Sequence, residues 1–366
     1  MDGISPFEYN RIVTAEHFIG RDKEVSKLKT LIKSKKNALL YGPPKIGKRS
    51  IVFNALTELQ KENVAIEICT IDIFNIRSLE GFLIKLATVV LDHFAETEQE
   101  KEYLSRTYIK DIELDTSKGY LLPERQVKHL LEFPECVAEE YKVHLIIYMQ
   151  QFQDILLFDK PLRAISLIEQ AFTKTRNINF IIVGDKRNAM DSIFVEKQFF
   201  RNLVTNINIK NISKKVFCEY ITERFAAWGK FAGTKEAGEI YDAMEGDPWY
   251  IQHLAEICFL LTRDKLTSDI VERGLQHLIS IHDYELHNTV YGLSTHQIHL
   301  IKAILDGVRK FSKTDILEKY HLNSSANVNR LKEALTKKEI VTFTNKNLIE
   351  FNDTLLKMWL KKYFFS

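Results

Sequence analysis

The sequence lacks the features that carry a protein into or across a membrane. No run reaches the roughly 18 apolar residues that a membrane-spanning helix requires. The first ten residues, MDGISPFEYN, have neither the basic segment nor the apolar segment of a secretory leader. These absences predict a soluble cytoplasmic protein without a membrane partner.

Cysteine pairs and an excess of charge of one sign are missing as well. The four cysteines form no C-x-x-C pair and have no histidine at a metal-binding spacing, so the sequence predicts neither a disulfide framework nor a metal site. The 51 Lys and Arg residues nearly balance the 49 Asp and Glu residues, and a net charge of +2 gives no global field that would attract nucleic acid. Only the tail from Leu293 onward is basic, with 13 Lys and Arg against 7 Asp and Glu.

The chain of 366 residues, 45% of them hydrophobic, is long enough for more than one core. In the first half, apolar strand-like segments alternate with helical patterns, which is typical of βαβ units in a parallel sheet. Amphipathic helices follow, and a helix, helix, turn, helix order with two short β-like segments then predicts a winged helix. We therefore predict an α/β domain with a parallel sheet at 1–211, a helical lid at 212–288 and a winged helix at 289–366. The predicted strands are 38–41, 64–71, 144–149 and 180–183 in the sheet and 340–344 and 348–351 in the wing, and the polar stretch 96–123 is predicted to be a surface excursion.

A glycine-bearing loop follows the first predicted strand and precedes an amphipathic helix. It matches G-x-x-x-x-G-K, in which glycines let the backbone wrap around phosphates and loop N–H groups face the anion. The motif's lysine reaches the β- and γ-phosphates. In this context we predict that a nucleotide is bound by Gly42, Pro43, Pro44, Lys45, Ile46, Gly47 and Lys48.

The residues that would hold Mg²⁺ depart from the standard motif. Arg49 stands where a Ser or Thr hydroxyl ligates the metal, and Ser50 lies one position further, about 100° around the helix. Arg49 either adds charge for the phosphates or fills the site. Gln150 and Gln151 end the third predicted strand where an Asp-Glu pair is expected, and a carboxamide neither charges the metal site nor takes a proton from water. The sequence thus predicts ATP or ADP binding with weak or absent hydrolysis and without a standard Mg²⁺ site.

These motifs, in this order, resemble those of the archaeal-type ATPase family, a branch of the STAND and AAA+ P-loop proteins, over nearly the whole chain. The loop is similar to the family's phosphate loop, with Arg49 in place of its Thr, and residues 150–153 resemble its Asp-Glu-Phe-Gln element with both carboxylates turned into amides. The family's N-terminal motif, which packs near the adenine, is resembled by Phe18, Ile19, Gly20 and Arg21.

Three further positions carry the resemblance. Asp185 follows a strand similar to the one that leads to the family's sensor position. Arg201 falls where members often carry an arginine, although a surface salt bridge is an equal alternative. The segment 246–252, centred on Pro248, is similar to the Gly-x-Pro segment that contacts the nucleotide base in STAND proteins, and the alternative is an ordinary helix-breaking turn.

The helical pattern at 324–337, which follows the turn, would be the recognition helix of the winged helix. Asn and Arg side chains pair with base edges in the major groove, and lysines meet phosphates. Winged helices of the resembling family often dock proteins instead, so DNA and an unidentified protein both stay open as partners. The candidate base contacts are Asn327, Asn329 and Arg330, and the candidate phosphate contacts are Lys313, Lys337, Lys338 and Lys346.

Three hypotheses for the function follow. The first is a nucleotide-dependent switch or scaffold that hydrolyses ATP poorly. The second is an active ATPase that uses Asp154 or Asp185 as its acidic group. The third is a DNA-binding or protein-docking winged helix whose P-loop domain is only structural.

Overall fold

The computed structural model describes residues 5–62, 64–109, 122–344 and 348–366. The chain divides into two compact units. The sheet unit contains residues 22–44 and 51–209, and the helical unit contains residues 1–21, 45–50 and 210–366. Within the described ranges, no helix is long and apolar enough to cross a membrane.

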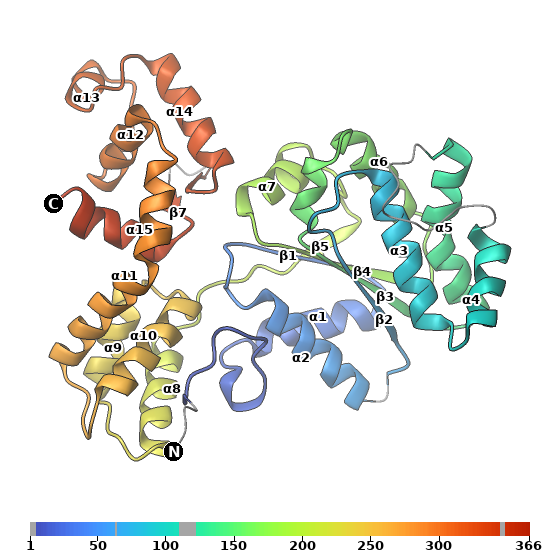
Figure 1. Ribbon diagram of the computed structural model, residues 1–366, viewed down its shortest axis with the longest axis horizontal. Helices are drawn as coiled ribbons and strands as arrows, with labels where there is room; N and C mark the ends of the chain where they lie inside the picture. The colour runs from blue at the N-terminus through green and yellow to red at the C-terminus, as the bar shows by residue number, and fades with distance from the viewer. Residues whose placement is uncertain (1–4, 63, 110–121, 345–347) are drawn as a thin grey trace. The chain divides into compact units, whose positions relative to one another are not determined.

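The sheet unit is built on five parallel strands in the order β2-β3-β4-β1-β5. Helices α1 and α2 lie on one face, and α3, α5 and α6 lie on the other (Figure 1). Because both faces are covered, β4 is buried along its whole length and β3 along nearly all of it. The strands are β1 Asn37–Tyr41, β2 Glu67–Asp72, β3 Leu145–Gln150, β4 Ile178–Gly184 and β5 Val204–Asn206, and the helices are α1 Asp22–Lys33, α2 Lys48–Lys61, α3 Leu79–Phe94, α4 Glu98–Leu104, α5 Glu124–Glu140, α6 Pro161–Phe172 and α7 Arg187–Asp191.

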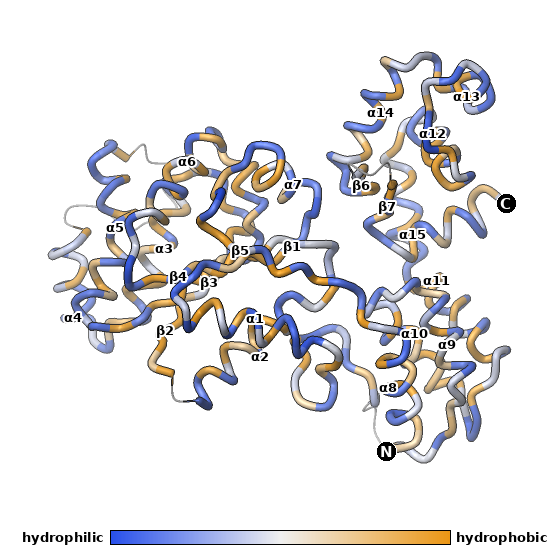
Figure 2. The backbone as a smooth tube through the Cα atoms, turned by 180° about the vertical axis from the view of Figure 1, so that it is seen from behind, coloured by the Kyte–Doolittle hydropathy of each residue, from blue (hydrophilic) through white to orange (hydrophobic). Residues whose placement is uncertain are grey.

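The helical unit contains a bundle of four helices followed by a small module of helices and two antiparallel strands. One continuous core of buried apolar side chains runs through both parts. Along the tube in Figure 2, hydrophilic and hydrophobic stretches alternate within the helices, as expected of amphipathic elements. The bundle comprises α8 Lys214–Ala227, α9 Thr234–Ala243, α10 Pro248–Leu261 and α11 Ser268–Tyr291, and the module comprises α12 Thr295–Leu305, α13 Thr314–Lys319, α14 Ser325–Lys337, β6 Val341–Phe343, β7 Ile349–Phe351 and α15 Thr354–Trp359.

The predicted architecture is confirmed, with two differences in the sheet unit. The sequence pattern does not reveal β5, because this strand has three partly exposed residues at the edge of the sheet. The stretch 96–123, predicted to be a surface excursion, contains α4 in its first part. Thr97 and Glu100 form a capping box at the start of α4, and the T-x-x-E pattern is a recognisable signal of a helix start. Residues 110–121 lie outside the described residues, and the predicted domain boundaries after 211 and 288 stay predictions.

Candidate nucleotide site

The loop between β1 and α2 has the backbone conformation of an anion cradle. Lys45 and Gly47 have φ angles of 64° and 96°, in the left-handed region. Left-handed residues within a turn direct neighbouring N–H groups toward one point, and the N-terminus of a helix adds partial positive charge there. Helix α2 begins at Lys48, whose side chain is only 3% exposed. The loop can therefore hold a phosphate group.

The N-terminal motif is fastened to this loop through Arg21. Arg21 is 3% exposed. Its Nη2 donates to the carbonyl oxygen of Ile46 at 3.0 Å, and its Nη1 donates to the carbonyl oxygen of Lys210. Gly20 has a φ of 62°, and a Cβ on it would lie 2.7 Å from Ile212 Cγ2. Phe18 and Ile19 are partly buried beside them. The structure thus brings the motif, residues 45–48 of the loop and the first lid residues together within the helical unit.

The residues present do not fit a standard Mg²⁺ site. Arg49, in the position of the usual hydroxyl ligand, is exposed. The hydroxyl of Ser50 accepts a hydrogen bond from the backbone N–H of Val13 at 3.1 Å, which gives it a structural role. Gln150 ends β3 with a neutral carboxamide. The donor set therefore lacks both the hydroxyl and the carboxylate that hold the metal in a P-loop site.

The polar groups that follow β3 and β4 are joined to one another in the sheet unit. Gln151, in the left-handed region with a φ of 55°, donates from Nε2 to Asp185 Oδ2 at 2.8 Å. Gln153 Oε1 accepts the backbone N–H of Asp185 at 3.0 Å. Asp154 is 5% exposed and pairs with Lys186 Nζ at 3.3 Å. Both carboxylates proposed as substitute catalytic groups are therefore engaged in contacts between the ends of two strands.

Pro248 begins α10 and is buried. Gly246 precedes it with a φ of 85°, and a Cβ there would lie 2.8 Å from Tyr241 Oη, so the position requires glycine. The side chain of Asp247 caps α10 by accepting the backbone N–H groups of Trp249 and Tyr250 at 3.0 and 3.1 Å. The segment is therefore a fixed turn that leads into a helix.

Aromatic side chains connect this turn to the phosphate loop. The sequence analysis does not predict this connection. Lys45 Nζ lies 3.6 Å from the centroid of the Trp249 ring. Tyr9 stacks on His253 with ring centroids 4.5 Å apart, and Trp249 packs edge-on against both rings. Tyr9 and Lys45 lie far from Trp249 in the sequence, so no local pattern predicts these contacts.

Burial shifts two titrating groups at this turn in ways that disfavour charge. It raises the pKa of Asp247 to about 6, against the opposing effect of the two capping hydrogen bonds. It also lowers the pKa of His253 to about 4, and the nearby His282 and Lys45 act in the same direction. His253 is therefore neutral at pH 7.

The remaining candidate residues lie in separate places. Arg201 is exposed in the sheet unit and donates to Gln198 Oε1 at 3.1 Å. On α14, Asn329 and Arg330 are exposed. Asn327 is half-buried, because its Nδ2 donates to the carbonyl oxygen of Leu322 at 3.1 Å, so its amide group is already in use. Lys346 lies outside the described residues.

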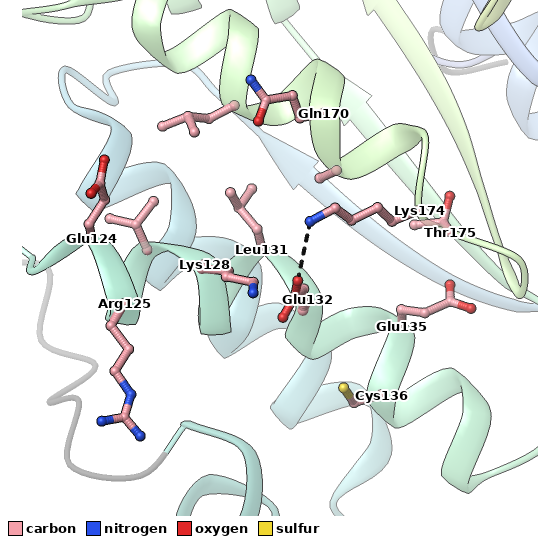
Figure 3. A pocket seen from close by; sticks show the side chains of 13 residues that line it. Glu124, Arg125, Lys128, Leu131, Glu132, Glu135, Cys136, Gln170, Lys174 and Thr175 are labelled. Carbon is pink, nitrogen blue, oxygen red and sulfur yellow. Dashed lines mark hydrogen bonds and ion pairs between the residues drawn. The ribbon is translucent and has the colours of Figure 1, made fainter.

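A cavity of about 670 Å³ lies between α5 and α6 in the sheet unit. Figure 3 shows Lys174 reaching across it to Glu132, at 3.5 Å. Glu135 accepts the backbone N–H of Asn177, just before β4, so this end of the cavity lies toward the amino ends of the strands. The phosphate loop follows the carboxyl end of β1, so the cavity is not part of that site.

Comparisons with known proteins identify the fold. The model of a family described as a probable winged helix domain matches residues 284–362. No curated protein matches the chain. The Walker-type ATPase PABY2304 of Pyrococcus abyssi has a TM-score of 0.67 and 16% identity, covering 97% of this chain and 99% of that one. The ORC2 protein of Aeropyrum pernix, in ADPNP-ADP complexes, has a TM-score of 0.59 and 13% identity, covering 96% of each chain. Cdc6p of Pyrobaculum aerophilum has a TM-score of 0.51 and 13% identity, covering 97% of this chain and 95% of that one.

At these identities the similarity establishes the fold and not the function. The sheet unit has the fold of an AAA+ P-loop domain, and a winged helix lies at the C-terminal end, as the sequence predicts. The fold is one that binds nucleotides in the Aeropyrum pernix protein.

Replacing Gly20 by alanine is expected to lower the free energy of unfolding by about 1 to 3 kcal/mol. A left-handed φ is costly for alanine, and its Cβ would also press against Ile212. The measurement is chemical denaturation. Gly292→Ala is the matched control, because Gly292 has a φ of −73° and an added Cβ would meet its neighbours at 3.5 Å or more. Equal effects of the two substitutions would contradict this account of Gly20.

The stability difference between Asp247→Asn and the wild type is expected to grow with pH. The folded pKa of Asp247, about 6, exceeds that of an unfolded aspartate, so the wild type loses stability as pH rises from about 4 to 6. Asparagine caps helices equally well but does not titrate. Between pH 4 and pH 7, the free energy of unfolding of the variant should rise by about 1 to 2 kcal/mol relative to that of the wild type. Chemical denaturation at each pH measures it. Parallel curves for the two proteins would refute the shifted pKa.

Proposed function

We propose that the protein binds ATP or ADP at the loop 42–48 and acts as a nucleotide-dependent switch or scaffold, with weak or absent hydrolysis. One observation carries this proposal: an anion-cradling loop leads into a helix N-terminus, while the groups that hold Mg²⁺ are replaced. The Aeropyrum pernix ORC2 protein, with a similar fold, was solved in ADPNP-ADP complexes.

In this proposal each part of the site has a distinct task. The N–H groups of the loop and the ammonium of Lys48 bind the phosphates. Arg21 holds the loop to the N-terminal motif through the carbonyl oxygen of Ile46. Phe18 and Ile19 lie near the base and Pro248 contributes to its contact, as the resembling family implies.

Weak hydrolysis follows from the chemistry of the substituted residues. A metal at this loop would position and polarise the γ-phosphate, and a carboxylate would activate water. Gln150 and Gln151 do neither, and Ser50 is bonded to Val13. The alternative of an active ATPase would require Asp154 to leave Lys186, or Asp185 to leave Gln151.

Direct contact of the winged helix with DNA is a second candidate function. It is favoured by the exposed side chains of Asn329 and Arg330 on α14 and by the basic charge of the module. Glu333, also exposed on α14, opposes it by like-charge repulsion of phosphates. Docking of a protein on the same surface is the competing possibility. With either partner, the P-loop domain would have only a structural role if it bound no nucleotide.

ADP and ATP are each expected to raise the midpoint of thermal unfolding by about 3 to 8 °C at 100 times the dissociation constant. The shift should be nearly the same with and without Mg²⁺, because the metal ligands are absent from the site. Lys48→Ala should greatly reduce the shift. Lys61→Ala, an exposed lysine at the other end of α2, should not.

Two results would contradict the proposal. The absence of a shift with either nucleotide would leave the sheet unit a structural role only. Phosphate release from ATP well above that of Lys48→Ala would show instead that the protein is an active ATPase.

If the winged helix contacts DNA, a random 30-base-pair duplex should bind at low salt, and the affinity should fall steeply as salt rises. Arg330→Ala should weaken binding and lower the slope of log affinity against log salt by about 1, since one cation near the phosphates is lost. Arg309→Ala is the matched control, an exposed arginine of the same module that bonds to the carbonyl oxygen of Val308. Fluorescence anisotropy measures both. No binding at low salt would leave protein docking as the role of this surface.

A further inference from the structure

The turn between α9 and α10, residues 245–250, contacts both the phosphate loop and the winged helix. We call it the lid turn. Residues 45–48 of the phosphate loop, the lid turn and the winged helix all belong to the helical unit, and α15 packs against α11 in the same unit (Figure 1). The lid turn is held in one conformation by Gly246 and by the cap that Asp247 places on α10. A displacement at one side of such a fixed turn is therefore passed to the other side.

On the side of the phosphate loop, the contact is electrostatic. Lys45 Nζ lies 3.6 Å from the ring centroid of Trp249 and 5.9 Å from that of Tyr250. An ammonium is attracted to the face of an aromatic ring, but the charge of a phosphate attracts it more strongly. Phosphates bound in the loop therefore compete with Trp249 for Lys45. Trp249 in turn packs edge-on against Tyr250, with ring centroids 5.0 Å apart.

On the side of the winged helix, the contacts are hydrogen bonds and an ion pair. Tyr250 is 6% exposed, and its hydroxyl donates to Asp353 Oδ2 at 3.1 Å. The other carboxylate oxygen of Asp353 accepts the backbone N–H of Leu356 at 2.9 Å and so caps α15. Burial, reinforced by Asp353, raises the pKa of Tyr250 well above its ordinary value, so the phenol keeps its proton. Lys357 of α15 lies 2.7 Å from both carboxylate oxygens of Glu245.

We propose that the lid turn carries nucleotide occupancy from the phosphate loop to the winged helix. Bound phosphates draw Lys45 away from Trp249, the aromatic pair shifts, and the hydrogen bond from Tyr250 to Asp353 weakens. Helix α15 then loses part of its N-terminal cap. This inference rests on the proposed function, because it requires a nucleotide in the loop.

Hydrogen exchange of the Leu356 amide with and without saturating ADP tests this route. This amide donates directly to Asp353, so its exchange reports the state of the cap. In the wild type, ADP should accelerate its exchange about 2- to 5-fold, the factor that corresponds to losing one exposed cation–π contact. In Tyr250→Phe, which keeps the ring and removes only the hydroxyl, ADP should have no effect on this amide.

Lys45→Met should also abolish the effect, measured at an ADP concentration that saturates this variant. Lys265→Met is the matched control, because Lys265 contacts the Phe231 ring at 5.7 Å in the same unit but lies away from the lid turn. It should keep the ADP effect in full. Calorimetric titration of each protein with ADP separates the two proposals.

If ADP binds the wild type but leaves Leu356 exchange unchanged, this inference is wrong while the proposed function stands. The inference is equally wrong if Tyr250→Phe responds to ADP as the wild type does. If ADP does not bind the wild type, both proposals are wrong.

Discussion

The buried guanidinium of Arg21 is the constraint on which the candidate site depends. A charge withdrawn from water costs several kcal/mol unless hydrogen bonds compensate it. Arg21 meets this cost through backbone carbonyl groups of Ile46 and Lys210, two segments that are distant in the sequence. Its planar fork fixes both at once, which a lysine could not do. The N-terminal motif, residues 45–48 of the phosphate loop and the beginning of the lid are thereby held in one compact unit.

The polar groups beyond β3 and β4 are held by one another at the ends of these two strands. Gln151 adopts a left-handed conformation, which costs a non-glycine residue about 1 to 2 kcal/mol. The conformation is compensated by the hydrogen bond to Asp185, and the pair of Asp154 with Lys186 lies close by. These contacts fasten two adjacent strands to each other. Such fixed partners hinder a group that must move or exchange protons during catalysis. They stabilise a scaffold, whose groups stay in place.

Local sequence patterns predicted the elements of this structure but not its long-range contacts. The apolar runs of β1 to β4 and the glycines of the phosphate loop are local patterns, and the structure has the elements that they indicate. The T-x-x-E pattern before α4 indicates a helix start within a stretch that is otherwise polar and weakly periodic. Strand β5 is too short to show a pattern. The contact of Lys45 with Trp249 depends on how distant segments pack, and so does the bond of Tyr250 with Asp353. No spacing in the sequence encodes either of them.

Charge balance explains how such a loop could retain a nucleotide after losing its metal. A metal-dependent P-loop meets the phosphate charge with a divalent ion, a lysine and a helix N-terminus that acts as about half a positive charge. Here Lys48 and the helix remain, and Lys45 and Arg49 place two further cations in or beside the loop. The total positive charge is therefore similar. Side chains on flexible stems do not, however, impose the octahedral geometry by which Mg²⁺ orients a leaving phosphate. Under the proposed function, Arg49 in place of a hydroxyl keeps the attraction for an anion, and together with Gln150 and Gln151 it leaves no template for hydrolysis.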